Sequence, residues 1–183
     1  WQELARAYAM PDVRPGDREL ISAPVDFLGI NYYFPTYVKA DPGSPYGANR
    51  IDSGREKTAM GWEVYAGGLY DLLVRLNKDY HIPIMITENG AAYADTLDAA
   101  GEVEDDRRLD YYRAHLIQAH RAIRAGVDLR GYFAWSLMDN FEWAEGFSKR
   151  FGLIYLEYPT QKRIVKKSGR WYSRVAAGNG LDA

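Results

Sequence analysis

A glutamate, Glu88, ends a segment that is otherwise apolar. Residues 82–86 read Ile-Pro-Ile-Met-Ile, which is typical of a buried strand, and Thr87, Glu88 and the turn pair Asn89-Gly90 follow directly. A carboxylate in this position can act as a nucleophile, a general base or a metal ligand. The simpler alternative is a carboxylate that is solvated in the turn after the strand. The residues around Glu88 leave both interpretations open.

Two other predicted strands also end in polar or aromatic residues. Asn31 and Tyr33 end the apolar segment 25–33, and Trp135 ends the aromatic part of segment 129–137. In parallel α/β sheets, functional side chains gather where the strands end and the loops begin. We therefore expect these residues to share one edge of a sheet with Glu88.

Tryptophans and a second carboxylate point to the kind of ligand. Trp62, Trp135 and Trp143 can each stack on the flat face of a sugar ring, although a single tryptophan is more often a core residue. Glu142 lies between Phe141 and Trp143, where an unpaired carboxylate is costly to bury. It is therefore exposed, paired with an arginine, or available to accept hydrogen bonds from vicinal hydroxyls. Carboxylates together with tryptophans favour carbohydrate binding.

The spacing of apolar residues predicts three successive strand–helix units. Strands are expected at 25–33, 82–87 and 129–137, helices at 67–80, 107–126 and 169–177, a hairpin from 151–158 and 162–167, and a loop at 40–54. Strands that alternate with helices indicate a parallel sheet. The α/β pattern fits either a small doubly wound sheet or part of a (β/α)₈ barrel.

Two of the predicted helices carry apolar stripes that should face the sheet. The expected core positions are Leu69, Leu72, Leu73, Leu76 and Tyr80 in the first helix, and Leu109, Tyr112, Leu116, Ala119 and Ile123 in the second. Asp105 and Asp106 are candidates to cap the start of the second helix, and Gly126 is expected just past its end.

Composition excludes several classes of protein. The chain has 183 residues, a length that suits one domain, and a net charge of −2, which favours neither nucleic acid nor a membrane surface as a partner. It has no cysteine and only three histidines, so thiolate chemistry is excluded and a metal site is not expected. No apolar run has the length of a membrane span. The basic segment 162–170 is interpreted as a solvated hairpin face.

Four segments resemble one family of enzymes. They are "DFLGINYY" (26–33), "MGWEVYAGGL" (60–69), "IMITENGAA" (84–92) and "GYFAWSLMDNFEWAEGFSKRFGL" (131–153). The chain resembles, over nearly its whole length from about residue 12, the carboxyl-terminal part of the glycoside hydrolase family 1 β-glycosidases. The resemblance implies that residues 1–183 are a single incomplete (β/α)₈ barrel segment, comprising about strands 6–8 and their helices.

The resemblance also implies roles for individual residues around the cleaved bond. Glu88 corresponds to the catalytic nucleophile, and Tyr33 to the residue that hydrogen-bonds to it and orients it. Asn31 lies near the opposite side of the cleaved bond, and Trp62 lies beside the leaving-group sugar.

The remaining implied roles concern the non-reducing sugar. Trp135 forms the floor beneath it, Glu142 accepts hydrogen bonds from its 4- and 6-hydroxyls, Trp143 donates its indole N–H to it, and Phe151 lines the same pocket. Since the Glu142 carboxylate would repel a phosphate, the expected substrate is an unphosphorylated β-glucoside or related β-glycoside. The implied reaction is retaining hydrolysis, which needs no cofactor.

The second catalytic carboxyl has no counterpart in this sequence. In the family it belongs to an Asn-Glu-Pro motif, which this chain lacks, as it lacks the arginine that usually flanks the nucleophile. We therefore expect the amino-terminal part of the same enzyme to be a partner that supplies the acid/base. The alternatives are an inactive sugar-binding half-barrel or pseudo-enzyme, and a doubly wound module with an unrelated ligand. The compartment stays open, with the cytoplasm favoured.

Overall fold

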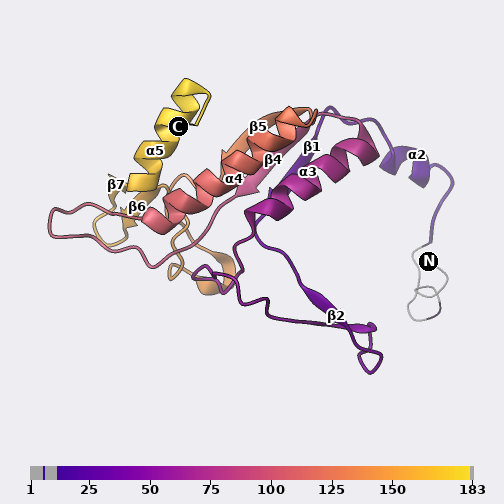
Figure 1. Ribbon diagram of the computed structural model, residues 1–183, viewed down its shortest axis with the longest axis horizontal. Coiled ribbons are helices and arrows are strands. Elements are labelled where there is room, and N and C mark those ends of the chain that lie inside the picture. Colours follow the sequence, from indigo (N-terminus) through magenta and orange to yellow (C-terminus); the bar gives the residue numbers. More distant parts are fainter. Residues whose placement is uncertain (1–5, 7–11, 182–183) are drawn as a thin grey trace.

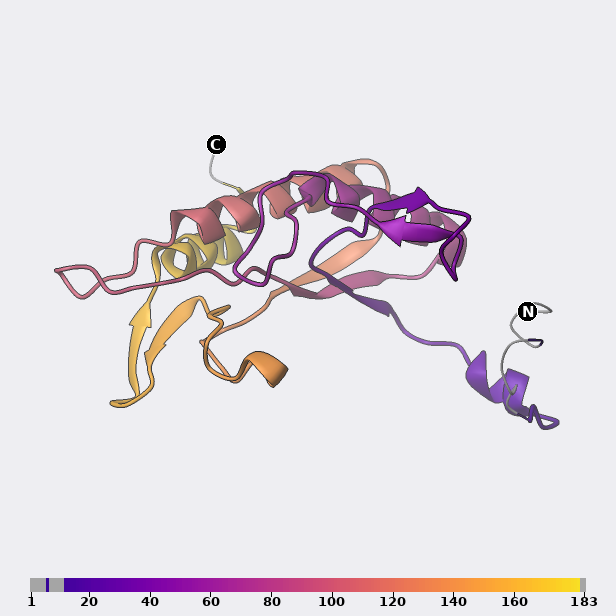
Figure 2. The same ribbon diagram turned by 90° about the horizontal axis from the view of Figure 1, so that it is seen from below.

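Three parallel strands form the central sheet of the structure, a computed structural model that describes residue 6 and residues 12–181. They are β1 (Leu28–Tyr32), β4 (Ile84–Asn89) and β5 (Leu129–Ala134), in the order β1-β4-β5. Helix α3 (Ala66–Tyr80) connects β1 to β4, and helix α4 (Asp106–Arg124) connects β4 to β5. Both helices lie on the same face of the sheet (Figures 1 and 2). The predicted α/β pattern with parallel strands is therefore confirmed.

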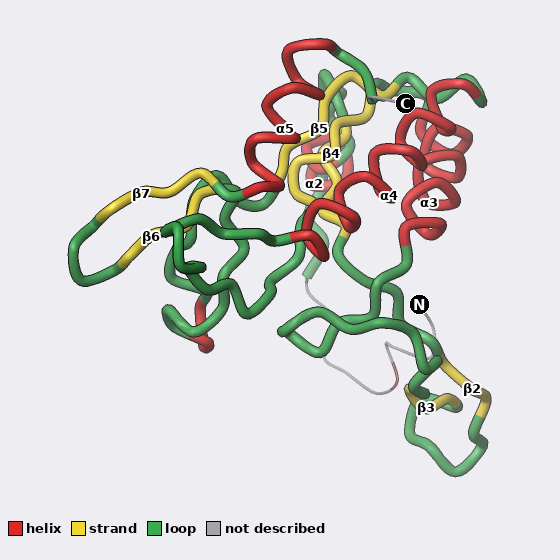
Figure 3. The backbone as a smooth tube through the Cα atoms, turned by 60° about the vertical axis from the view of Figure 1, so that its left-hand side comes forward, coloured by secondary structure: helices red, strands yellow, loops and turns green. Residues whose placement is uncertain are grey.

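Shorter elements surround this sheet. They are α2 (Asp17–Ile21), the antiparallel pair β2 (Val38–Ala40) and β3 (Ala48–Arg50), the 3₁₀ helix η1 (Trp143–Glu145), the antiparallel pair β6 (Ile154–Glu157) and β7 (Lys162–Val165), and α5 (Lys167–Gly178). The β2–β3 hairpin projects away from the helices (Figure 3). It falls largely within the predicted loop 40–54, where Asp41 accepts hydrogen bonds from Gly43 and Asn49 and closes a turn tight enough for pairing.

The core lies between the sheet and the two long helices. Ile30, Ile84 and Ile86 from the strands pack against Leu69 and Leu73 of α3 and against Ala119 and Ala122 of α4. The predicted stripes are correct apart from their last members, Tyr80 and Ile123, which are 59% and 48% exposed. Both stand in the final turn of their helices, where the chain turns toward the next strand.

None of the long helices α3, α4 and α5 covers the opposite face of the sheet (Figure 2). Phe27 and Phe133 are 44% and 56% exposed, and Asn31 is exposed as well. An apolar face of a sheet is normally covered by another layer, and a face that is left open to water is normally polar. This face therefore has the composition of a surface that another layer covers.

Strand β5 ends earlier than predicted, at Ala134 instead of residue 137. The Trp135 N–H still donates to the Asn89 carbonyl of β4 (2.8 Å), whereas Ser136 donates to the Phe151 carbonyl (3.3 Å) and accepts from the Leu153 N–H (2.9 Å). From Ser136 onward the chain therefore pairs with the segment before β6 and leaves the sheet.

Two predictions about charged residues were only partly correct. Asp105 is the N-cap residue of α4, as predicted, but its side chain accepts hydrogen bonds from the backbone N–H of Ser168 (2.8 Å) and from Arg108, so the carboxylate serves the first turn of α5 and not that of α4. In the basic segment, Lys162 and Arg163 are exposed as predicted, whereas Lys166 is completely buried. Lys166 follows β7 and is paired in the interior with Asp95 (2.5 Å) and Asp139 (2.8 Å).

Candidate active site

The carboxyl ends of β1 and β4 bring Asn31 and Glu88 side by side. The two residues are paired across the parallel ladder, just after a register shift between Ile30 and Asn31. Asn31 Oδ1 accepts a hydrogen bond from the Thr87 hydroxyl at 2.7 Å. A local irregularity of this kind re-aims side chains at the end of a strand. The expectation that the two strand ends meet is confirmed.

Tyr33 contacts Glu88 directly. The Tyr33 hydroxyl donates to Oε2 of Glu88 over 2.6 Å, and both side chains are half-buried. Burial raises the pKa of Tyr33 far above its ordinary value, and the hydrogen bond to Glu88 raises it further. The phenol therefore stays protonated and acts as a donor to the carboxylate.

Aromatic rings surround this pair. Trp62 lies edge-on to Tyr33 with ring centroids 5.3 Å apart, and stacks on Phe34 at 4.9 Å. Phe151 is 1% exposed and has its ring 6.0 Å from Trp62 and 6.3 Å from Tyr33. Rings from three distant parts of the chain therefore form one wall beside Glu88.

Glu142 is a buried carboxylate with an unused oxygen. It is 8% exposed, and its Oε2 accepts no hydrogen bond from the described residues. Burial raises its pKa, the side-chain hydrogen bond from Trp135 lowers it, and the negative charge of Glu88 raises it. Among the described residues no arginine pairs with it, and it is not exposed. Two of the three alternatives open from the sequence, an exposed carboxylate and one paired with an arginine, therefore do not hold for the described residues, and the role in sugar binding stays a prediction.

Trp135 is fixed against the loop after β4. Its carbonyl oxygen accepts a hydrogen bond from the Tyr112 hydroxyl at 3.0 Å, and the Trp135–Ser136 peptide bond is cis. A Cβ atom at Gly90 would collide with the same carbonyl, so only glycine allows this close approach. Trp143 begins η1 and is 81% exposed, so this predicted site residue, like Asn31, is not buried.

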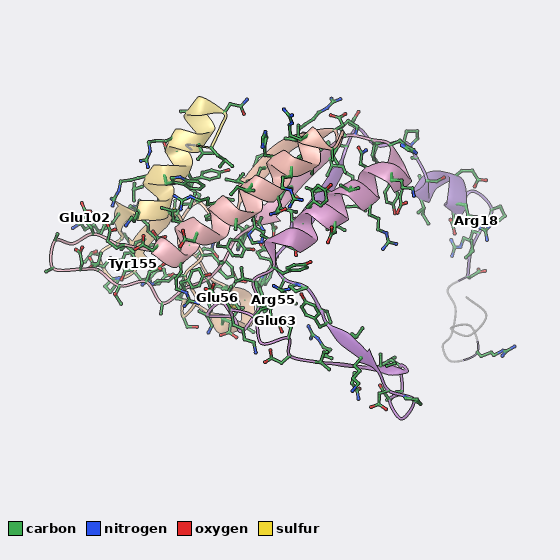
Figure 4. The ribbon with its side chains drawn as sticks, in the orientation of Figure 1. Arg18, Arg55, Glu56, Glu63, Glu102 and Tyr155 are labelled. Carbon is green, nitrogen blue, oxygen red and sulfur yellow. The ribbon has the colours of Figure 1, made fainter. Side chains whose placement is uncertain are left out.

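Polar contacts hold the loop that carries Trp62. Arg107 of α4 pairs with Glu56 at 2.7 Å, and Ser53 hydrogen-bonds to Glu63. The Arg55 guanidinium lies 4.5 Å from the centroid of the Tyr65 ring. Figure 4 shows Arg55, Glu56 and Glu63 near the start of α3. These contacts attach the Trp62 loop to the helix layer.

A buried amide network behind Glu88 was missed in the sequence. Asn89 was assigned to a turn, but it is the last residue of β4 and is completely buried. Its Nδ2 donates to the Tyr32 carbonyl (2.6 Å) and to the Tyr111 hydroxyl (3.0 Å), and its Oδ1 accepts from Tyr132. The Tyr111 hydroxyl in turn donates to the Tyr33 carbonyl at 3.3 Å. The carbonyl of Tyr33 is thus linked through Tyr111 to the side chain of Asn89, the residue that follows Glu88.

Two other kinds of functional element have no candidate in the described part of the chain. No three His, Asp or Glu side chains come together as metal ligands would within residues 12–181. Over the same residues, no helix has the length and apolar character needed to cross a membrane.

Comparisons with known proteins identify the family. Residues 2–181 match the family described as Glycosyl hydrolase family 1. The chain is 50% identical over 181 residues to Beta-glucosidase A of Thermotoga maritima. This match covers 98% of this chain and 40% of the relative. It is 41% identical over 190 residues to a 6-phospho-beta-galactosidase of Streptococcus equi subsp. zooepidemicus, of which it covers 40%.

Solved structures agree with the sequence comparison. Beta-glucosidase from Thermotoga maritima in complex with methyl acetic acid-substituted glucoimidazole superimposes with a TM-score of 0.92 and 49% identity, over 98% of this chain and 40% of that one. The sheet and its helices are thus an α/β part of a TIM barrel. The chain belongs to glycosyl hydrolase family 1. It spans about 40% of the length of the curated relatives that it matches.

Proposed function

We propose that this chain is the carboxyl-terminal part, about strands 6–8, of a (β/α)₈ barrel that hydrolyses β-glycosidic bonds with retention of configuration. The observation that carries the proposal is the 2.6 Å hydrogen bond from Tyr33 to Glu88 at the carboxyl edge of the sheet. A carboxylate held by a neutral donor inside an aromatic wall is oriented for attack on an anomeric carbon.

Glu88 is the nucleophile of this reaction. Its carboxylate oxygen forms a bond to the anomeric carbon while the bond from that carbon to the leaving oxygen breaks, and a second carboxyl group gives the leaving oxygen its proton. Water then attacks the glycosyl-enzyme, loses a proton to that second group and releases Glu88. The two carboxyl groups of retaining enzymes lie about 5–5.5 Å apart.

The second carboxyl group belongs to the remainder of the barrel. The sequence has no Asn-Glu-Pro motif, and the chain covers 40% of the first relative's length. Glu142 binds sugar in this scheme, because its buried, unpaired Oε2 needs donors of the kind that sugar hydroxyls provide. The amino-terminal part of the barrel is therefore the partner of this chain.

The substrate class follows from the charge of the sugar pocket. One relative is named a 6-phospho-beta-galactosidase, so family membership alone does not tell phosphorylated from unphosphorylated substrates. Glu142 makes this distinction, because a carboxylate near Glu88 would repel a 6-phosphate. Trp135, Trp143 and Phe151 complete the sites for an unphosphorylated sugar. A hollow of about 390 Å³ beside Trp62, lined also by Phe34, Tyr37 and Ile51, gives room for the leaving group.

The test uses this chain both alone and in a barrel fusion. The fusion joins the amino-terminal part of Thermotoga maritima Beta-glucosidase A, up to the point where the match begins, to residues 1–183. We expect the fusion to hydrolyse p-nitrophenyl β-glucoside and this chain alone to be inactive. A 2-deoxy-2-fluoro-glucosyl fluoride should form a covalent adduct on Glu88, read by peptide mass. A folded fusion without that adduct would favour the alternative, an inactive sugar-binding half-barrel.

A further inference from the structure

Six charged side chains outside the candidate active site form one buried ion cluster. They are Asp95, Asp105 and Asp139 with Arg108, Arg150 and Lys166, so that three negative charges meet three positive ones. The side chains of five members are at most 3% exposed, and that of Arg150 is 17% exposed. Ions are rarely buried this completely unless every charge has a partner.

One side of the ion cluster holds the loop that follows Glu88. Asp95 accepts from Arg108 at 2.8 Å and from Lys166 at 2.5 Å. The Arg108 Nε donates to the carbonyl of Ala91 at 3.1 Å, three residues after Glu88. The path of the chain just after the nucleophile is therefore fixed by charge-assisted bonds.

The other side holds the loop that carries Glu142. Asp139 accepts from the Gly152 N–H (3.0 Å), from Lys166 (2.8 Å) and from Arg150 (2.5 Å), so both of its oxygens are engaged. Arg108 also donates to the Arg150 carbonyl at 2.7 Å. Both ends of the segment 139–152, which includes Glu142 and Phe151, are therefore tied to the same cations.

Arg108 and Lys166 each touch both loops. Lys166 pairs with Asp95 from the loop after β4 and with Asp139 from the loop after β5. Arg108 pairs with Asp95 and donates to the Arg150 carbonyl in the loop after β5. A fully satisfied buried polar network has one well-defined geometry. The distance between the two loops is then set by the ion cluster and not only by the strands.

We propose that the ion cluster is a positioning device that fixes Glu142 relative to Glu88, and that it thereby determines the preference for sugars with a hydroxymethyl group at C5. The inference rests on the proposed function, in which Glu142 accepts hydrogen bonds from the hydroxyls at C4 and C6. A β-xyloside has the same ring but lacks the C6 hydroxymethyl group. Displacing Glu142 should therefore weaken turnover of glucosides more than of xylosides.

The test compares two substrates in the barrel fusion. Asp139→Asn is assayed with p-nitrophenyl β-glucoside and p-nitrophenyl β-xyloside, and rates are expressed per active site titrated with the fluoro-glucosyl reagent. We expect kcat/KM for the glucoside to fall about tenfold or more, mainly through KM, and that for the xyloside to fall less than about threefold. Glu142→Gln should shift the preference in the same direction.

Controls separate positioning from folding. Asp110→Asn removes an exposed partner of Arg113, with side chains 71% and 48% exposed, and should change neither constant. If Asp139→Asn fails to fold, Arg150→Lys serves instead, because the Arg150 side chain is partly exposed and a lysine keeps the charge while it loses the forked geometry.

The ratio of glucoside to xyloside turnover distinguishes a positioning role of the ion cluster from a purely structural one. An unchanged glucoside-to-xyloside ratio per titrated site, with only the titratable fraction reduced, would mean that the ion cluster is merely structural and would overturn the inference. An equal fall for both substrates would overturn it too. A fusion with the intact cluster that forms no Glu88 adduct would instead count against the proposed function.

Discussion

The Tyr33 hydroxyl lies 2.6 Å from Oε2 of Glu88, and it is a protonated donor because burial and the carboxylate both raise its pKa. Removing that donor leaves the carboxylate in the same aromatic surroundings without its fixed partner.

Tyr33→Phe in the barrel fusion should therefore keep the fold and lose rate. We expect kcat/KM for p-nitrophenyl β-glucoside to fall about 10- to 100-fold, which corresponds to about 1.4–2.7 kcal/mol of transition-state stabilisation. Tyr46→Phe is the matched control, because Tyr46 is 86% exposed. A Tyr33→Phe fusion with unchanged kcat/KM would show that the hydrogen bond does not orient the nucleophile.

Gly90 sets the contact between the loop after Glu88 and the end of β5. In Gly90→Ala the added methyl group would meet the Trp135 carbonyl, a backbone atom that cannot move aside. We expect a loss of about 3 kcal/mol in stability, the upper part of the range for overpacking, together with reduced activity. Thermal unfolding of the fusion measures the loss of stability, and steady-state kinetics measure the loss of activity.

The control for this change lies in helix α5. A Cβ at Gly178 meets nothing within 4 Å, so Gly178→Ala should leave stability unchanged or raise it slightly. Equal unfolding midpoints for the Gly90→Ala and Gly178→Ala fusions would refute the close approach.

The strand ends could be predicted because local patterns encode them. An apolar run that stops at Glu88, and aromatic runs that stop near Tyr33 and Trp135, place side chains at a common edge once the strands are parallel. The resemblance to a known family then added roles that spacing alone did not assign.

The buried polar residues could not be predicted, because their partners are remote. Lys166 pairs with Asp95, which is 71 residues away in the sequence, and Asn89 of the sheet hydrogen-bonds to Tyr111 of helix α4. From the sequence alone, a lysine in a basic segment is more often exposed to solvent. An asparagine before a glycine is more often part of an exposed turn.

His115 predicts a dependence of stability on pH. It is completely buried against Tyr111, its Nε2 has no partner among the described residues, and burial lowers its pKa from 6.5 to about 4. Between pH 6.5 and 4 the unfolded chain binds a proton that the folded chain does not, so stability falls as pH falls through this range. From pH 7 to pH 5 the loss attributable to His115 is about 2 kcal/mol.

A substitution that cannot titrate should remove this loss. We expect the His115→Gln fusion, although less stable at pH 7, to lose about 2 kcal/mol less than the unaltered fusion between pH 7 and pH 5, measured by denaturant unfolding. Parallel stability–pH curves for the His115→Gln and unaltered fusions would contradict the assignment.

Glu142 should show opposite effects on stability and activity. A buried carboxylate with an unpaired oxygen, near the negative charge of Glu88, is unfavourable to the fold, and a ligand would relieve this by supplying donors. Glu142→Gln should therefore raise the stability of the unliganded fusion by about 1 kcal/mol while it lowers kcat/KM for the glucoside at least about tenfold. Glu145→Gln, at the end of the 3₁₀ helix that begins just after Glu142 but exposed, should do neither. If Glu142→Gln lowered both stability and activity, the carboxylate would be part of the fold's own hydrogen bonding and not reserved for a sugar.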